Sequence, residues 1–222
     1  MNAEQLEVVE CVNRNRIIAI IRGYDPEVCL HLAESYANGG IRMIEVTFPQ
    51  AHPELWGKTA DAIEKIRERF GSEILAGAGT VITAEQLKIA REAGARYVIS
   101  PNVDPAIIRA AVDSGLVAMP GAFTPSEIVT AHTAGAQFVK LFPVGAMGPS
   151  YVKALRAPLA HIPMLAVGGI SADNVADFIE AGCAGAGVGG DLTKREFIEA
   201  KAWNEITACA KKLVDNAKGA KK

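Results

Sequence analysis

The chain has 222 residues, of which 50% are hydrophobic, and a formal net charge of −2. A chain of this length and apolar content can bury a large core as a single domain. The charge gives no basic footprint for nucleic acid, and no uninterrupted apolar run reaches the roughly 18 residues that a membrane span needs, so we expect neither partner. The first residues are acidic and amphipathic, unlike a signal peptide, and they predict a cytoplasmic protein.

The cysteines and histidines show no spacing typical of a disulfide framework or a metal site. They are Cys11, Cys29, Cys183 and Cys209, and His31, His52, His132 and His161. We expect reduced thiols, no bound metal and no cofactor.

A unit of strand, loop and helix repeats along the chain, after an amphipathic helix over residues 3–14 that we interpret as a lid or plug. Helix starts are marked by Asp25-Pro26 and by a capping box from Thr83 to Gln86. Short apolar runs predict eight strands, at residues 17–21, 43–48, 74–79, 97–100, 116–119, 137–143, 164–167 and 184–189.

Eight buried strands that alternate with helices predict a parallel sheet covered by helices on its outer face. The expected fold is a single α/β domain over residues 1–222, a (β/α)8 TIM barrel with an extra N-terminal helix. Residues 1–16 form that helix, 17–190 the barrel strands, and 191–222 a C-terminal helix with a frayed tail. The alternative, a doubly wound open sheet, usually has five or six units and a GxGxxG turn, which are both missing.

The run at residues 137–143 places Lys140 in the middle of an apolar strand. A buried ammonium is costly, and lysines in apolar surroundings lose their proton more easily, which leaves an amine that can form a Schiff base. A lysine that snorkels at the strand end, or one half of a buried ion pair, is the structural alternative.

Side-chain alternation places Lys140 on the inner face of the barrel together with Phe138 and Phe142. The same rule turns Glu45 and Thr47 of the second strand inward. A lysine and a carboxylate in one barrel interior supply a nucleophile and a proton-transfer group, although a structural ion pair is again possible.

Glycines lie at the ends of three predicted strands, in the segments 77–79, 168–169 and 187–190. Backbone without side chains can approach a ligand closely and direct its amides at an anion. The loops after the seventh and eighth strands are also where TIM barrels often bind phosphate.

Several motifs in this order closely resemble the KDPG/KHG aldolases. They are Glu45-Val46-Thr47-Phe48, Gly77-Ala78-Gly79-Thr80-Val81, Ser100-Pro101, Met119-Pro120-Gly121, Thr124-Pro125-Ser126-Glu127, Val139-Lys140-Leu141-Phe142-Pro143, Val167-Gly168-Gly169-Ile170 and Gly187-Val188-Gly189. Members of this family are class I aldolases that cleave 2-keto-3-deoxy-6-phosphogluconate or 4-hydroxy-2-oxoglutarate to pyruvate and an aldehyde.

The resemblance implies that Lys140 is the Schiff-base lysine and Glu45 the general acid/base. It implies that Thr80 binds the carboxylate of the 2-keto acid, with Arg22 as cationic partner, and that the protein is a homotrimer. The remaining residues expected to bind substrate are Thr47, Pro101, Phe142, Gly168, Gly169, Gly189, Gly190 and Asp191.

Two segments depart from the family pattern. Pro49 stands where some members carry an arginine, and Gly190 and Asp191 stand where members that bind phosphate tend to have a serine. A carboxylate near a phosphate repels it unless it points away or caps a helix, so the sequence leaves open whether the substrate is phosphorylated. Two other functions stay open as well, an isomerase or epimerase of phosphate sugars and a non-catalytic barrel that binds sugar acids.

Overall fold

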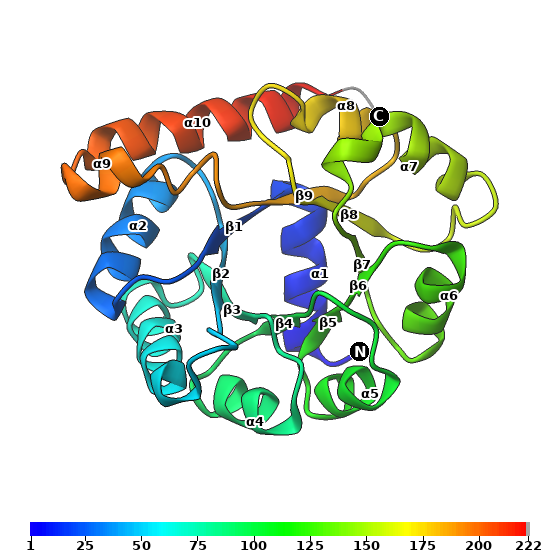
Figure 1. Cartoon of the computed structure of the whole chain (residues 1–222), viewed down its shortest axis with the longest axis horizontal. Coiled ribbons are helices and arrows are strands. Elements are labelled where there is room, and N and C mark those ends of the chain that lie inside the picture. Colours follow the sequence, from blue (N-terminus) through cyan, green and yellow to red (C-terminus); the bar gives the residue numbers. More distant parts are fainter. Residues whose placement is uncertain (221–222) are drawn as a thin grey trace.

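The computed structural model describes residues 1–220, and it shows a ring of parallel strands surrounded by helices (Figure 1). The strands are β1 (Ile17–Ile21), β2 (Met43–Thr47), β3 (Leu75–Gly79), β4 (Tyr97–Ile99), β5 (Val117–Met119), β6 (Gly121–Ala122), β7 (Val139–Leu141), β8 (Met164–Val167) and β9 (Gly185–Val188). The helices are α1 (Ala3–Asn15), α2 (Pro26–Asn38), η1 (Pro53–Leu55), α3 (Trp56–Phe70), α4 (Ala84–Glu92), α5 (Pro105–Asp113), α6 (Pro125–Thr133), η2 (Gly145–Met147), α7 (Gly148–Arg156), α8 (Val175–Glu180), α9 (Arg195–Glu199) and α10 (Trp203–Gly219). The predicted TIM barrel with an N-terminal helix is confirmed.

The nine strands described are the eight predicted ones and β6, because the fifth strand resumes after Pro120, where we predicted a loop. Its first part, β5, pairs with β4, and its second part, β6, pairs with β7. Proline has no N–H to donate to a sheet, so the ladder breaks where it stands. The Pro120 carbonyl still accepts a hydrogen bond from Lys140 N at 2.9 Å, and the two parts of this strand together close the ring.

The signals read from the sequence mark the observed helix ends. Thr83 and Gln86 form the predicted capping box of α4, and Gly94 follows this helix with a φ of 83°. At the C-terminus the chain forms two helices instead of one, with a turn through Lys201 between α9 and α10. The frayed tail that we predicted falls in part on residues 221–222, which lie outside the described residues.

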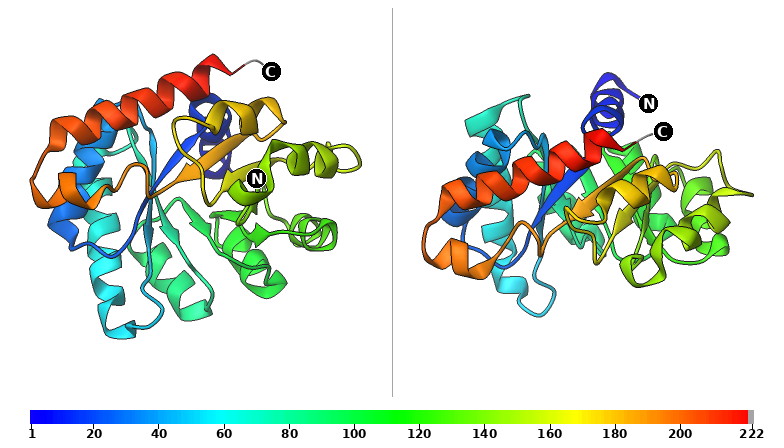
Figure 2. Two further views of the ribbon diagram at one scale, coloured as in Figure 1. Left: turned by 45° about the horizontal axis from the view of Figure 1, so that its top comes forward. Right: turned by 90° about the horizontal axis from the view of Figure 1, so that it is seen from above.

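Side chains alternate between two hydrophobic layers. The outer layer fills the space between strands and helices, and the inner layer fills the barrel. The inner layer consists of Val8, Val12, Ile18, Met43, Leu75, Tyr97, Ile99, Val117, Met119, Phe138, Leu165 and Val167. Because Val8 and Val12 belong to α1, this helix plugs one end of the barrel, as Figure 2 shows from the side.

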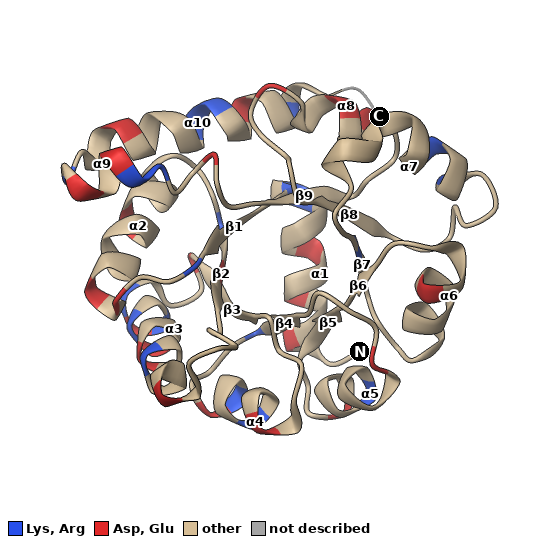
Figure 3. Ribbon diagram, in the orientation of Figure 1, with Lys and Arg blue, Asp and Glu red and all other residues tan. Residues whose placement is uncertain are grey.

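Both acidic and basic residues lie along the outer helices (Figure 3). Their ion pairs are largely solvent-exposed, as between Lys212 and Asp173, and such pairs contribute little stability. Among the charged side chains of residues 1–220, only Glu45 and Lys140 are buried, with 2% and 7% of their surface exposed. No helix in this part of the chain combines the length and apolar character needed to cross a bilayer.

Packing of α1 into the barrel predicts that Val12→Ala lowers the free energy of unfolding by roughly 2 kcal/mol, because it leaves a cavity at a site where the valine is 1% exposed. Chemical denaturation measures this loss. Leu6→Ala on the exposed side of the same helix is the control, and we expect a change within about 0.5 kcal/mol. Equal losses in the two variants contradict the plug.

Candidate active site

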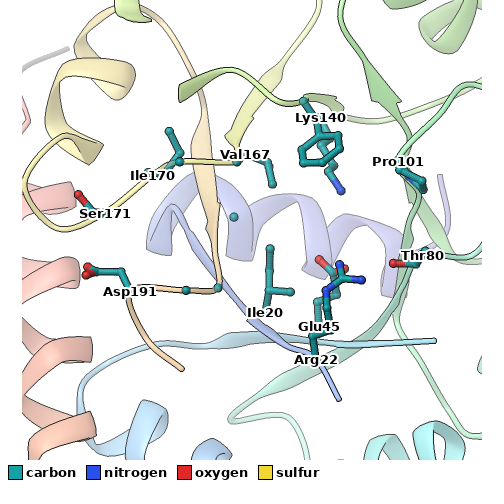
Figure 4. Close-up of a pocket in the computed structure, with 16 residues that line it drawn as sticks. Ile20, Arg22, Glu45, Thr80, Pro101, Lys140, Val167, Ile170, Ser171 and Asp191 are labelled. Carbon is teal, nitrogen blue, oxygen red and sulfur yellow. The ribbon is translucent and has the colours of Figure 1, made fainter. Parts of the chain in front are cut away.

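A cavity of about 830 Å³ opens at the carboxyl ends of the strands. Eleven of the twelve side chains or glycines predicted for the site line it, namely Arg22, Glu45, Thr80, Pro101, Lys140, Phe142, Gly168, Gly169, Gly189, Gly190 and Asp191. In Figure 4 Lys140, Glu45, Arg22 and Thr80 gather on one side, and Asp191 and Ser171 lie on the opposite side. The cavity therefore has two chemically different ends.

Lys140 reaches this cavity from the middle of β7, in the inward direction that strand alternation predicts. Its Nζ lies 4.6 Å from the centre of the Phe142 ring. Burial lowers the pKa of Lys140, the negative charge of Glu45 raises it, and Arg22 lowers it, with a net decrease. The amine is therefore more easily obtained in its neutral, nucleophilic form than that of a free lysine.

Glu45 approaches the same space from β2, and glycine on the neighbouring strand makes room for it. A methyl group on Gly79 would lie 1.7 Å from Glu45 Oε1. Burial raises the pKa of Glu45, which Lys140 and Arg22 lower to a smaller extent. Glu45 Oε2 is fully enclosed and has no hydrogen-bond partner among residues 1–220.

Lys140 and Glu45 interact through their charges without forming a hydrogen-bonded salt bridge within residues 1–220. A structural ion pair normally satisfies its two charges directly. The arrangement found here leaves both groups available to a molecule in the cavity.

Tyr97 lies beside this pair and was not predicted from the sequence. Its ring extends over Gly77, the residue opposite Glu45 in the sheet, where a methyl group would come within 2.3 Å of Tyr97 Cε2. The hydroxyl is fully buried without a partner among residues 1–220, and burial, followed by the Glu45 charge, raises the pKa of Tyr97 well above its usual value. Only the pairing of β4 with β3, together with the Tyr97 ring over Gly77, reveals this neighbour.

Thr80 and Pro101 stand at the ends of β3 and β4, close to Lys140 in Figure 4. Thr80 has a φ of 58°, an uncommon left-handed conformation for a residue with a branched side chain. The twelfth predicted residue, Thr47, does not line the cavity: its side chain is buried and Thr47 Oγ1 lacks a partner within the described chain.

The opposite end of the cavity is built from the loops after β8 and β9. Asp191 Oδ2 accepts a hydrogen bond from Ala172 N at 2.9 Å, so this carboxylate ties one loop to the other and does not cap α9. Gly168 and Gly169 have φ values of 88° and 77°, which only glycine adopts without strain. Residues that line the cavity and that we did not predict are Ile20, Val167, Ile170, Ser171 and Gly187.

No group of three or more His, Cys, Asp or Glu side chains within residues 1–220 is placed to hold a metal ion. The reactive groups that the cavity offers are the Lys140 amine and the Glu45 carboxyl group. Together they can form an imine with a carbonyl compound and move the protons that this reaction requires.

Comparison with known proteins gives the same family as the motifs. The family model for KDPG and KHG aldolase matches residues 8–209. The 2-dehydro-3-deoxy-6-phosphogalactonate aldolase of Escherichia coli (strain K12) is 40% identical over 177 residues, which are 79% of this chain and 83% of that protein.

Two solved structures are also similar. One, described as native KDPGal, has a TM-score of 0.82 and 36% identity, and the match covers 92% of this chain and 95% of that one. The other is KDPG aldolase from Legionella pneumophila with pyruvate captured as a covalent carbinolamine, with a TM-score of 0.80, 28% identity and coverage of 92% and 97%. The prediction from the motifs is confirmed, and this chain belongs to the KDPG and KHG aldolase family.

Proposed function

We propose that this protein is a class I aldolase that cleaves a 2-keto-3-deoxy sugar acid to pyruvate and an aldehyde through a Schiff base on Lys140. One observation carries this proposal. The only two buried charged side chains of residues 1–220, Lys140 and Glu45, line one open cavity, and neither has a hydrogen-bonded ionic partner. Burial acts on both pKa values in the direction that favours their neutral forms.

The reaction begins when the neutral Lys140 Nζ adds to the C2 carbonyl of the substrate. Glu45 supplies a proton to the carbinolamine oxygen, which leaves as water, and a protonated imine remains. Glu45, now ionised, takes the proton of the C4 hydroxyl. The electrons of the C3–C4 bond move into the imine, the aldehyde is released and an enamine remains. Protonation at C3 and hydrolysis of the imine then release pyruvate and restore the amine.

In this proposal Thr80 and Arg22 bind the carboxylate at C1. An arginine guanidinium offers two parallel hydrogen bonds to a carboxylate, and Arg22 lies beside Glu45 in Figure 4. The Phe142 ring, which lies against Lys140 Nζ, and Pro101 provide apolar walls for the short pyruvyl part of the substrate. The aldehyde part extends toward Gly168, Gly169, Gly189, Gly190 and Asp191.

For the far end of the substrate we propose a phosphate group. The similar protein from Escherichia coli is named for a 6-phosphogalactonate derivative, and glycines with unhindered backbone line this end. Asp191 Oδ2 is already bound to Ala172 N, which reduces the repulsion that its charge exerts on an anion.

The resemblance to the family also supports a cytoplasmic homotrimer. Three large hydrophobic side chains, Ile82, Val129 and Met147, are at least 37% exposed on the single chain and are candidates for contact between subunits. The four cysteines of the chain are free thiols, which fits a reducing compartment.

We expect borohydride reduction in the presence of pyruvate to leave one 1-carboxyethyl group on Lys140, because reduction converts the imine to a stable secondary amine. Peptide mass spectrometry locates the adduct. Lys140→Ala removes it, and Glu45→Gln keeps some trapping while losing most cleavage activity. A wild-type protein that gains no mass contradicts the Schiff base. That result is the one expected of an isomerase or of a non-catalytic binding barrel.

The charge of Glu45 raises the pKa of Lys140, so Glu45→Gln lowers this pKa further. The neutral amine is the reactive form, and we therefore expect reductive methylation of Lys140 to begin at a lower pH in this variant than in the wild type. Quantitative peptide mass spectrometry measures the rate, and labelling of the exposed Lys153 in the same sample normalises for reagent. A shift toward higher pH contradicts the proposed coupling.

We expect the phosphorylated form of a 2-keto-3-deoxy sugar acid to be cleaved with a kcat/KM at least about tenfold above that of its unphosphorylated form. The unphosphorylated acid lacks the charge-assisted contact of the phosphate, and the loss of one such contact has about this effect. Asp191→Asn keeps an acceptor for Ala172 N but removes a negative charge, so it lowers KM for the phosphorylated acid only. Equal kcat/KM values for the two acids contradict a phosphate site.

A further inference from the structure

Gln50 joins the two loops that follow β2 and β3, outside the residues that touch the cavity. Its Nε2 donates to Thr80 O at 2.8 Å and to Phe48 O at 3.2 Å. Its Oε1 accepts from Gln86 Nε2 at 2.9 Å. The side-chain amide thus uses both of its N–H groups and its oxygen to link the loops.

Gln86 holds the side-chain amide of Gln50 in place. It is fully buried at the start of α4, and its Oε1 accepts from Ile82 N at 2.8 Å and from Thr83 N at 3.2 Å. An orphaned buried amide is costly, so Gln86 holds a single orientation that presents Nε2 to Gln50. The network therefore links a rigid helix start to the loop that carries Thr80.

Thr80 is the residue that needs this support. Its φ of 58° places it in a left-handed conformation, and a residue other than glycine keeps such a conformation only where its surroundings impose it. Of the three non-glycine residues with positive φ in residues 1–220, namely Arg16, Thr80 and Lys201, only Thr80 lines the cavity.

We propose that Gln50 is a positioning residue that holds the Thr80 backbone, and with it the Thr80 hydroxyl, in place to bind the carboxylate of the 2-keto acid. This inference rests on the proposed function for the identity of the ligand. Gln50 itself does not line the cavity, so it acts through Thr80. Its loss weakens binding of the 2-keto acid and leaves the bond-breaking step at Lys140 and Glu45 intact.

Gln50→Met tests the proposal, since methionine keeps the length of the side chain and removes its hydrogen bonds. We expect the pyruvate concentration for half-maximal borohydride trapping, and KM for cleavage, to rise about tenfold, as when one hydrogen bond to a charged group is weakened. The value of kcat changes less than about twofold, because an interaction made equally in the ground and transition states affects KM alone.

The Thr80→Ala background shows whether Gln50 acts through Thr80. There the hydroxyl is already absent, and Gln50→Met raises the half-saturating concentration by less than about twofold, as coupled residues do in a double-mutant cycle. Gln5→Met is the matched control: Gln5 Nε2 also bridges two carbonyl groups, Val112 O at 3.1 Å and Leu116 O at 3.0 Å, at the closed end of the barrel. This control loses stability without a change in KM.

An unchanged KM in Gln50→Met overturns the inference, and so does an equal increase in the two backgrounds. If the wild-type protein traps no pyruvate, the proposed function is wrong, and the role of Gln50 is then tested separately. In that case hydrogen exchange at Val81 N, which donates to Ile99 O at 3.1 Å next to Thr80, still tests the positioning role. Faster exchange in Gln50→Met than in the wild type supports it, and equal exchange overturns it.

Discussion

The burial of two opposite charges inside one barrel, without direct pairing, is the constraint on which the rest of this structure depends. Glu45 and Lys140 each lose hydration, and each recovers only part of the loss from the other's field. The stability of the barrel must therefore come from elsewhere, and its two apolar layers, including the plug that α1 contributes, are one source. In both groups burial shifts the pKa toward the neutral form, and on this the proposed roles of the amine and the carboxyl group depend.

The break in the fifth strand lies beside the strand that carries Lys140. Pro120 cannot donate to a neighbouring strand, and the ring closes around it through two short strands, β5 and β6. The carbonyl groups of Pro120 and Ala122 accept from the backbone N–H groups of Lys140 and Phe142. The strand that carries Lys140 is thus held on this side by an interrupted partner, and Lys140 still points inward in register with the other strands.

Strand alternation and glycine-ended strands were sufficient to predict the barrel, the inward direction of Glu45 and Lys140, and the glycines of the cavity wall, because each depends on local periodicity. Arg22, Thr80 and Pro101 were expected only from the resemblance to the family. The inward direction of Thr47 was predicted from the same alternation, and its side chain is buried, but it is not among the residues that line the cavity. Tyr97 and Gln50 were missed because their importance arises from neighbours on other strands and loops, and nothing in the spacing of either residue indicates them.

The two ends of the cavity differ in construction, since one is lined by buried side chains and the other by loop backbone. In the proposed function the first end carries out the reaction and the second selects the substrate. Near Lys140 the ligand meets buried side chains whose positions depend on the barrel interior and on the Gln50 and Gln86 network. At the far end it meets backbone of the β8 and β9 loops, joined by the hydrogen bond from Ala172 N to Asp191. Loops tolerate substitution far better than a packed interior does. Under the proposed function, we therefore expect changes around Gly190 and Asp191 to alter which aldehyde is accepted while the imine chemistry at Lys140 stays the same.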